Sequence, residues 1–340
     1  MNTIIGSKTA EAPAQVVQLQ VTADDAGQRL DNFLMRQLKG VPKTHVYRII
    51  RSGEVRLNKA RASAQTRLAA GDQVRLPPVR QSQRAQDKAQ AQREGAAGGL
   101  TLRQFSVVYE DEHVLVVDKP AGVAVHGGSG VSYGVIEQLR MTRPQAPFLE
   151  LVHRLDRETS GLLLVAKKRS ALTALQDQFR QRQTGKTYYA LTKGQWPASL
   201  KVLDQPLHKY LLPGSGERRV KVVSRDDPDG MPALTLVRVV SANAAFSLLQ
   251  VRIKTGRTHQ IRVHLAHAGH PIAGDDKYGD FALNRALAAL PQNPLRRMFL
   301  HAGRLAFDHP ASGARIDLYA PLPPELARAA ITPAIPEPLP

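Results

Sequence analysis

The sequence predicts an α+β fold in two parts: a small basic α+β domain, then a larger domain built on a mainly antiparallel mixed sheet. Three observations predict it. Apolar segments of strand length outnumber helical patterns after residue 104. A Gln/Ala/Arg-rich stretch without apolar periodicity separates the two parts. The charge is uneven, since residues 29–103 hold 16 basic and 5 acidic residues, which is 11 of the net charge of +18.

The composition of the 340 residues excludes several classes of protein. Zero cysteines exclude a thiol nucleophile, a Cys-ligated zinc site, an iron–sulfur cluster and disulfides. We expect no membrane partner and a cytoplasmic location, since no run of 18 apolar residues and no signal-peptide pattern occur. The positive excess favours a nucleic-acid partner.

Residues 21–80 are predicted to form the small domain. Leu30, Phe33 and Leu34 recur at helical spacing, and a second helix from Lys43 ends at Gly53, a suitable C-terminal cap. Short strands are expected at residues 55–58 and 72–76. Basic side chains on and after the second helix suit RNA, although an isolated basic helix is commonly a solvated surface. These candidate RNA-binding residues are Lys43, Arg48, Arg51 and Arg56.

The remaining boundaries follow from composition. Residues 1–20 are expected to be an N-terminal tail, residues 81–103 a flexible linker and residues 326–340 a Pro-rich C-terminal tail. The larger domain then spans residues 104–325. Its expected strands are residues 105–109, 114–117, 162–166, 187–191, 234–240 and 246–253, and its expected helices lie near residues 135–139 and 172–179.

The densest group of reactive residues is His153-Arg-Leu-Asp-Arg-Glu-Thr-Ser-Gly161. Asp156 lies between Arg154 and Arg157, and guanidinium groups keep a carboxylate ionised. An ionised carboxylate suits a nucleophile or a base. An aspartate that bridges arginines or caps a turn is the alternative. A polar turn that opens onto a buried strand is a common place for function.

A second group is Lys254-Thr-Gly-Arg-Thr-His-Gln-Ile-Arg-Val-His264. Its Arg257, His259, Gln260 and Arg262 offer donors for phosphate, ribose or a base edge. Histidines also recur every three residues from His264 to His270, a spacing that could bind zinc. Because no HExxH motif and no acidic third ligand accompany them, we predict packing and hydrogen bonding for these histidines, and no metal.

Two further segments complete the candidates. The Gly-rich residues 117–130 match neither the GxxxxGK[ST] nor the GxGxxG pattern, so no nucleotide cofactor is predicted. We predict instead that these residues form a loop that shapes a pocket wall. The segment Lys186-Thr-Tyr-Tyr-Ala190 carries two tyrosines in a predicted strand, and tyrosines in strands ordinarily pack against neighbouring side chains. A tyrosine that faces a pocket could stack on a base.

Residues 153–161 resemble the signature of the bacterial pseudouridine synthases that act on ribosomal large-subunit RNA. Residues 118–122, 186–190, 255–262 and 274–279 match the same family in order, and residues 21–78 are similar to its S4 RNA-binding domain. The resemblance implies that uridines of 23S rRNA near the peptidyl transferase centre become pseudouridine. It implies no cofactor. The expected partner is 23S rRNA, either free or in an assembling large subunit, and the protein is expected to be a monomer.

The resemblance also implies site roles. Asp156 would be the nucleophile or base, Arg262 its ion-pair partner, and Tyr188 the ring that stacks on the flipped base. The other implied substrate-binding residues are His153, Arg154, Arg157, Lys119, His126, Arg257, His259 and Gln260.

Two alternatives stay open. An RNA-binding assembly factor without catalysis would share the basic domain and the charge. An N-glycosidase would release free uracil, but hydrolytic glycosidases commonly need two opposed carboxylates, and Asp156 is the one candidate carboxylate identified.

Overall fold

The computed structural model describes residues 16–22, 25–38, 41–79, 103–127, 133–214 and 216–330. The chain divides into two compact units, Met1–Thr101 and Leu102–Pro340. The predicted linker lies outside the described residues except for Arg103, as do residues 1–15 and 331–340 of the predicted tails. In the part of the chain that is described, no helix has both the length and the apolar character to cross a bilayer.

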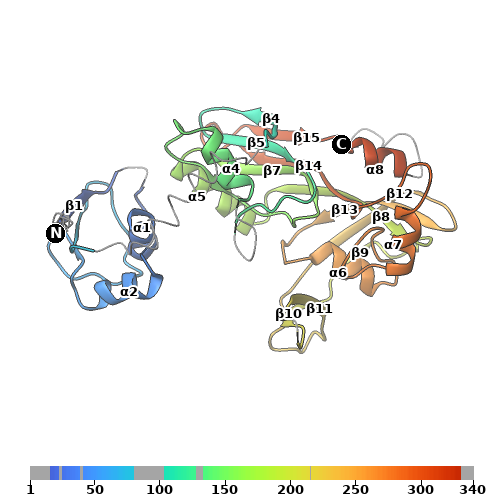
Figure 1. The fold of residues 1–340 in the computed structure, drawn as a ribbon, viewed down its shortest axis with the longest axis horizontal. Helices are drawn as coiled ribbons and strands as arrows, with labels where there is room; N and C mark the ends of the chain where they lie inside the picture. The colour runs from blue at the N-terminus through green and yellow to red at the C-terminus, as the bar shows by residue number, and fades with distance from the viewer. Residues whose placement is uncertain are drawn as a thin grey trace, which may run out of the picture. The chain divides into compact units, whose positions relative to one another are not determined.

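The first unit is a three-stranded antiparallel sheet with two helices (Figure 1). Its elements are β1 (Val17–Gln20), α1 (Leu30–Gln37), α2 (Lys43–Arg51), β2 (Arg56–Leu57) and β3 (Gln73–Leu76). The predicted tail is therefore wrong for its last four residues. Val17–Gln20 pairs along the whole of β3, and Leu19 of β1 packs against the core of the unit.

The two helices bury the apolar faces that the sequence predicts. Leu30, Phe33 and Leu34 of α1 are buried against Val46 and Ile49 of α2. The predicted cap is confirmed as well. Gly53 follows α2 with a φ of +75° and donates its N–H to the Ile50 carbonyl at 3.0 Å, a conformation that glycine adopts without strain.

The second unit is organised by a ten-stranded sheet of order β4-β5-β7-β14-β8-β13-β12-β9, with β15 on β14 and β6 on β7 (Figure 1). Among the described strands, β14 and β7 are parallel and the other pairs are antiparallel, which confirms the mainly antiparallel mixed sheet. The strands of this sheet are β4 (Ser106–Glu110), β5 (Val114–Lys119), β6 (Glu150–Leu151), β7 (Ser160–Ala166), β8 (Gly185–Lys193), β9 (Val202–Leu203), β12 (Thr235–Ala242), β13 (Phe246–Ile253), β14 (Leu300–Asp308) and β15 (Arg315–Tyr319).

Helices and one hairpin surround this sheet. The helices are α4 (Val135–Thr142), α5 (Arg169–Arg180), α6 (Gln260–His267), α7 (Phe281–Ala288) and α8 (Pro324–Ala329), and the antiparallel hairpin consists of β10 (Leu207–Leu211) and β11 (Arg218–Val222). One core cluster includes Leu139 of α4 and Leu265 of α6. A second cluster lies under α5 and includes Leu172 and Leu175.

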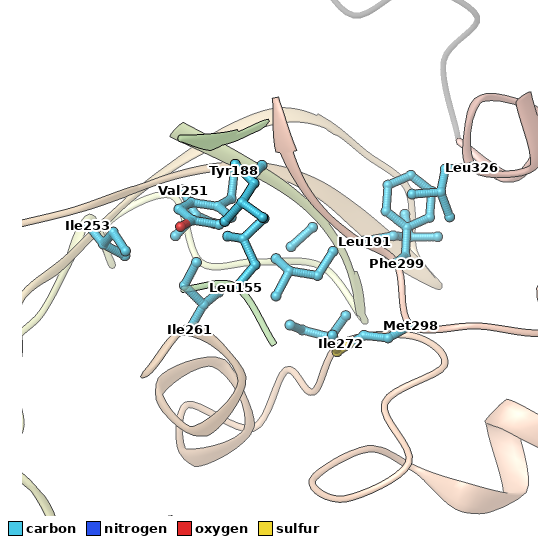
Figure 2. Packing of buried hydrophobic residues seen from close by; sticks show 14 of the residues in the cluster. Leu155, Tyr188, Leu191, Val251, Ile253, Ile261, Ile272, Met298, Phe299 and Leu326 are labelled. Atoms are coloured by element: carbon cyan, nitrogen blue, oxygen red, sulfur yellow. The ribbon is translucent and has the colours of Figure 1, made fainter. Parts of the chain in front are cut away.

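The predicted C-terminal boundary at residues 325 and 326 is wrong, because it falls inside α8. Leu326 is fully buried in the first core cluster, where Figure 2 shows it beside Phe299. Glu325 accepts a hydrogen bond from Arg297 at 3.1 Å. Helix α8 is therefore part of the larger domain.

The pairing of β7 with β14 places the loop that carries Asp156. Gly161 of β7 has a φ of +111°, and a Cβ there would lie 2.3 Å from the Ala302 carbonyl oxygen of β14. A side chain at this position would force the two strands apart. Glycine therefore allows the loop at residues 153–160 to end tightly against the centre of the sheet.

Candidate active site

A pocket opens where the loop at residues 154–159 meets the N-terminal end of α6 and one face of β8 and β13. It is lined by Arg154, Leu155, Asp156, Thr159, Tyr188, Ile253, Gly256, Arg257, Thr258, His259, Gln260, Ile261, Arg262 and Leu300. Three chain segments far apart in sequence thus contribute Asp156, Tyr188 and Arg262 to one site.

Asp156 and Arg262 form an ion pair in the lining of this pocket. Arg262 Nη1 lies 3.7 Å from Asp156 Oδ2, and the exposed fractions of the side chains are 3% and 18%. This distance leaves Asp156 without a tight bidentate bond to the guanidinium. Its carboxylate is thus oriented by a fixed positive charge while it remains open to a molecule in the pocket.

Arg262 is held in place from its other side by two aspartates. Its Nε and Nη2 donate to the two carboxylate oxygens of Asp275 at 2.8 and 2.6 Å, and Nη2 also donates to Asp276 at 2.9 Å. Burial opposes the charge of Arg262, but the bonds and charge of Asp275 dominate and raise the pKa of the guanidinium. Burial alone would raise the pKa of Asp275, but the hydrogen bonds and charge of Arg262 lower it. Arg262 therefore stays charged, with Nη1 directed at Asp156.

Tyr188 reaches the pocket from β8. Figure 2 shows its ring beside Val251 and Leu155, with Ile261 of α6 in the same cluster. Burial, followed by the charge of Asp156, raises the pKa of Tyr188. The phenol therefore keeps its proton at neutral pH and presents a neutral aromatic ring to the pocket.

The sequence neighbours of Asp156 behave differently from expectation. Arg157 is exposed and pairs with Glu158 at 3.0 Å, so the prediction that it holds Asp156 ionised is wrong. Arg154 is exposed and lines the pocket. The guanidinium paired with Asp156 comes from Arg262 on α6, a contact between distant segments that local spacing does not reveal.

Lys119 is fully buried, so its prediction as a substrate-binding residue is wrong. Its ammonium donates to the carbonyls of Pro120, Val123 and Arg157 at 2.9, 2.8 and 3.0 Å. It thereby ties the loop at residues 120–123 to the loop that carries Asp156. Burial lowers the pKa of Lys119 to about 7.

The buried ammonium predicts a pH dependence of stability. The pKa of Lys119 falls from 10.5 to about 7 on folding, so the unfolded chain binds more protons between these values and the lysine makes stability rise with pH there. Lys119→Met removes this contribution and the three hydrogen bonds that the ammonium donates. We expect urea unfolding to give a less stable variant whose deficit is larger at pH 9.5 than at pH 7. An equal deficit at both pH values would contradict the assignment.

His153 and Gln260 have hydrogen-bond partners within the protein, and their contact with substrate stays a prediction. His153 Nε2 accepts a hydrogen bond from the Leu164 N–H at 3.0 Å, and its ring stacks on Phe179. Burial lowers the pKa of His153 to about 3, so the ring stays neutral. Gln260 is 3% exposed, accepts from Thr255 at 2.7 Å and donates to the Thr235 hydroxyl at 2.9 Å.

The other predicted donors lie in or near the pocket. Arg257 lines it and donates to the Pro232 carbonyl at 3.1 Å. His259 begins α6 with a φ of 52° and shares a 2.8 Å hydrogen bond with the Tyr278 hydroxyl. Burial, despite the charge of Asp156, lowers the pKa of His259, which favours a neutral ring. His126 is exposed and is not among the described residues that line the pocket.

His264 on α6 and His270 after it have the predicted structural roles. His264 shares hydrogen bonds of 2.9 Å with the Thr235 hydroxyl and the Gln205 carbonyl. His270 bonds to the Lys193 carbonyl at 2.9 Å and packs against Trp196. Each imidazole thus has its own partners on different elements.

The basic residues of the first unit lie on and after α2. Lys43 and Arg51 are exposed, Arg56 is half-buried, and Arg48 pairs with Glu54 at 3.3 Å. Their contact with RNA remains a prediction.

Sequence reasoning missed the residues that hold Arg262. Asp275, Asp276 and Tyr278 lie in the segment Gly274–Gly279, for which the sequence predicts no role beyond its match to the family. The Tyr278 ring lies 5.3 Å from the guanidinium carbon of Arg262. Two consecutive aspartates thirteen and fourteen residues after a candidate arginine were the available signal.

Comparisons with known proteins agree with this geometry. Residues 113–267 match the family model described as RNA pseudouridylate synthase, and residues 28–74 match the S4 domain. The structure is similar to that of Human RNA Pseudouridylate Synthase Domain Containing 1, with a TM-score of 0.54 and 27% identity over 67% of this chain and 88% of that one.

Curated relatives extend the match to nearly the whole chain. The chain is 50% identical over 308 residues to Ribosomal large subunit pseudouridine synthase C of Escherichia coli (strain K12), covering 91% of this chain and 93% of the relative. It is 48% identical over 319 residues to the protein of that name from Vibrio cholerae, covering 94% and 97%. The chain therefore belongs to the RNA pseudouridylate synthase family, isomerases that convert uridine to pseudouridine, and carries an S4 domain ahead of the synthase domain.

Proposed function

We propose that this protein converts specific uridines of 23S rRNA, near the peptidyl transferase centre, to pseudouridine, with Asp156 as the nucleophile or base. The observation that carries the proposal is the Asp156–Arg262 pair in a pocket that also holds Tyr188. The identity with large-subunit pseudouridine synthases over nearly the full chain supports the substrate. A cytoplasmic monomer acting on free rRNA or on an assembling large subunit fits this proposal.

The reaction breaks the N1–C1′ bond of uridine and joins C5 to C1′, with no net oxidation and no net gain of protons. The target nucleotide leaves its stack at a cost of a few kcal/mol. Arg262 holds the Asp156 carboxylate in position for the ribose, and the ring of Tyr188 supports the flipped base. The exposed Arg154 and the half-buried Arg257 border the pocket and are suited to hold its phosphates.

Tyr188→Phe separates the ring from its hydroxyl. After C5 bonds to C1′, the C5 proton must leave, and in this proposal the Tyr188 hydroxyl relays it. We expect the variant to bind rRNA like the wild type and to form pseudouridine about 10²-fold more slowly. Single-turnover kinetics with saturating enzyme measures this. A rate within a few-fold of the wild type would assign Tyr188 to stacking alone.

The proposal is tested by mapping pseudouridine along unmodified 23S rRNA after incubation with the purified protein. We expect new pseudouridines at a few positions and no free uracil. Release of uracil would identify an N-glycosidase instead. Tight binding that leaves each uridine unchanged would identify an assembly factor.

A further inference from the structure

The second unit has a groove on the sheet that is separate from the pocket around Asp156. The groove has a volume of about 540 Å³ and crosses β8, β12, β13, β14 and β15. Four arginines and one acidic residue are among its lining residues, namely Arg238, Arg252, Arg304, Arg315 and Asp317. We call this surface the arginine groove.

The arginine groove lies on the opposite face of the sheet from the pocket. On β8, Tyr188 lines the pocket and its neighbour Thr187 lines the groove. On β13, Ile253 lines the pocket and its neighbour Arg252 lines the groove. Successive residues of a strand point to opposite faces, so the two surfaces cannot be filled by one nucleotide.

The charge of the arginine groove is only partly balanced by its surroundings. Arg304 forms a salt bridge with Asp317 at 2.5 Å, and Arg315 forms one with Asp308 at 2.9 Å. Arg238 and Arg252 are exposed, and within the described residues neither has an ion pair or a side-chain hydrogen bond. Two guanidinium groups on the neighbouring strands β12 and β13 are therefore available to an anionic partner.

The strand register sets the spacing of these two side chains. Arg238 is opposite Gln250 and Arg252 is opposite Leu236, so the two arginines are diagonal neighbours across β12 and β13. Such neighbours are separated by about 7–8 Å. Two long arginine side chains that start from this spacing can reach neighbouring phosphates of one RNA strand, and guanidinium groups recognise phosphate by paired hydrogen bonds.

We propose that the arginine groove binds the phosphate backbone of a second segment of the substrate RNA, away from the segment that carries the target uridine. The proposal rests on the proposed function, since it assumes a structured RNA substrate large enough to reach both faces of the sheet. RNA is favoured over an acidic protein because the unpaired guanidiniums suit regularly spaced phosphates, and the lining includes no large exposed apolar side chain to anchor a protein.

The test uses the full chain with Arg238→Gln/Arg252→Gln, compared with a control, Arg180→Gln/Arg225→Gln, that removes the same charge from exposed salt bridges elsewhere. Affinity for a 23S rRNA domain is measured from 50 to 200 mM salt. Affinity falls as salt rises, so the slope of log affinity against log salt is negative. We expect the groove variant to make this slope less negative by about 1.4–1.8, the value for two lost phosphate contacts. We expect Arg238→Lys/Arg252→Lys to retain most of the slope, and a short stem-loop that carries only the target uridine to be converted at the wild-type rate by all variants.

The outcomes separate this inference from the proposed function. If the wild type forms no pseudouridine in 23S rRNA, the proposed function fails. If the wild type does so and the groove variant keeps the slope of the control, the arginine groove does not bind RNA. If the groove variant loses affinity for pre-ribosomal particles but not for protein-free rRNA, the groove binds an acidic protein and the proposal is overturned.

Discussion

Asp156→Asn is expected to abolish pseudouridine formation while the fold and RNA affinity are retained. Asparagine has the same shape but is neither a nucleophile nor a base at neutral pH. Arg262 keeps its bonds to Asp275 at 2.8 and 2.6 Å in the variant, so no buried charge is left without a partner. We expect a rate lower by about 10⁴-fold or more.

This prediction is measured by tritium release from rRNA labelled at C5 of uridine, because the C5 hydrogen leaves when C5 bonds to C1′. Asp204→Asn is the matched control, since Asp204 pairs with Arg225 on the surface, away from the pocket. We expect the control to release tritium at the wild-type rate. Release by Asp156→Asn within tenfold of the wild type would exclude Asp156 as the reacting group.

Asp275→Ala is expected to cause the largest loss of stability among single substitutions near the site. The side chains of Arg262 and Asp275 are 3% and 1% exposed. The substitution therefore leaves the buried positive charge of Arg262 without the carboxylate that offsets the cost of burying it. Breaking such a pair costs about 3–5 kcal/mol. Arg262 also becomes free to move onto Asp156, so turnover should fall more than RNA affinity does.

Asp276→Ala is the control for this prediction. Asp276 contacts the same Arg262 Nη2 at 2.9 Å but is 62% exposed, and exposed ion pairs contribute about 0–1 kcal/mol. Denaturant unfolding gives the stability of each variant, and turnover is measured with excess enzyme where the protein is folded. If the two variants lose equal stability, Asp275 does not hold Arg262. If Asp275→Ala is destabilised but turns over normally, its role is structural only.

The sequence predicted the class of fold and the three residues that meet in the pocket. The segments with Asp156, Tyr188 and Arg262 carry motifs of a known family, and the order of these motifs can be read from the sequence alone. The strand β14 was missed, although it joins β7, β8 and β15, because glycine, histidine and arginine interrupt its apolar pattern. Helix α6 was missed for a similar reason, since Arg262 and His264 on it are buried polar residues.

The sequence could not show which polar side chains the fold buries. Lys119 and Gln260 have the chemistry of substrate-binding residues, but the fold encloses both and fills their hydrogen bonds with backbone groups and neighbouring side chains. Conversely, Asp275 looks like a loop residue until the chain brings it against Arg262. Such roles depend on contacts between distant segments, which residue type and local spacing do not determine.

The role proposed for Asp156 in forming pseudouridine in 23S rRNA can be measured by mapping. Unmodified 23S rRNA is treated with either wild-type protein or Asp156→Asn, at concentrations where both are bound, and pseudouridine is mapped along it. We predict new pseudouridines at a few positions with the wild type and none with the variant. The same sites with both proteins, or no site with either, would contradict the claim.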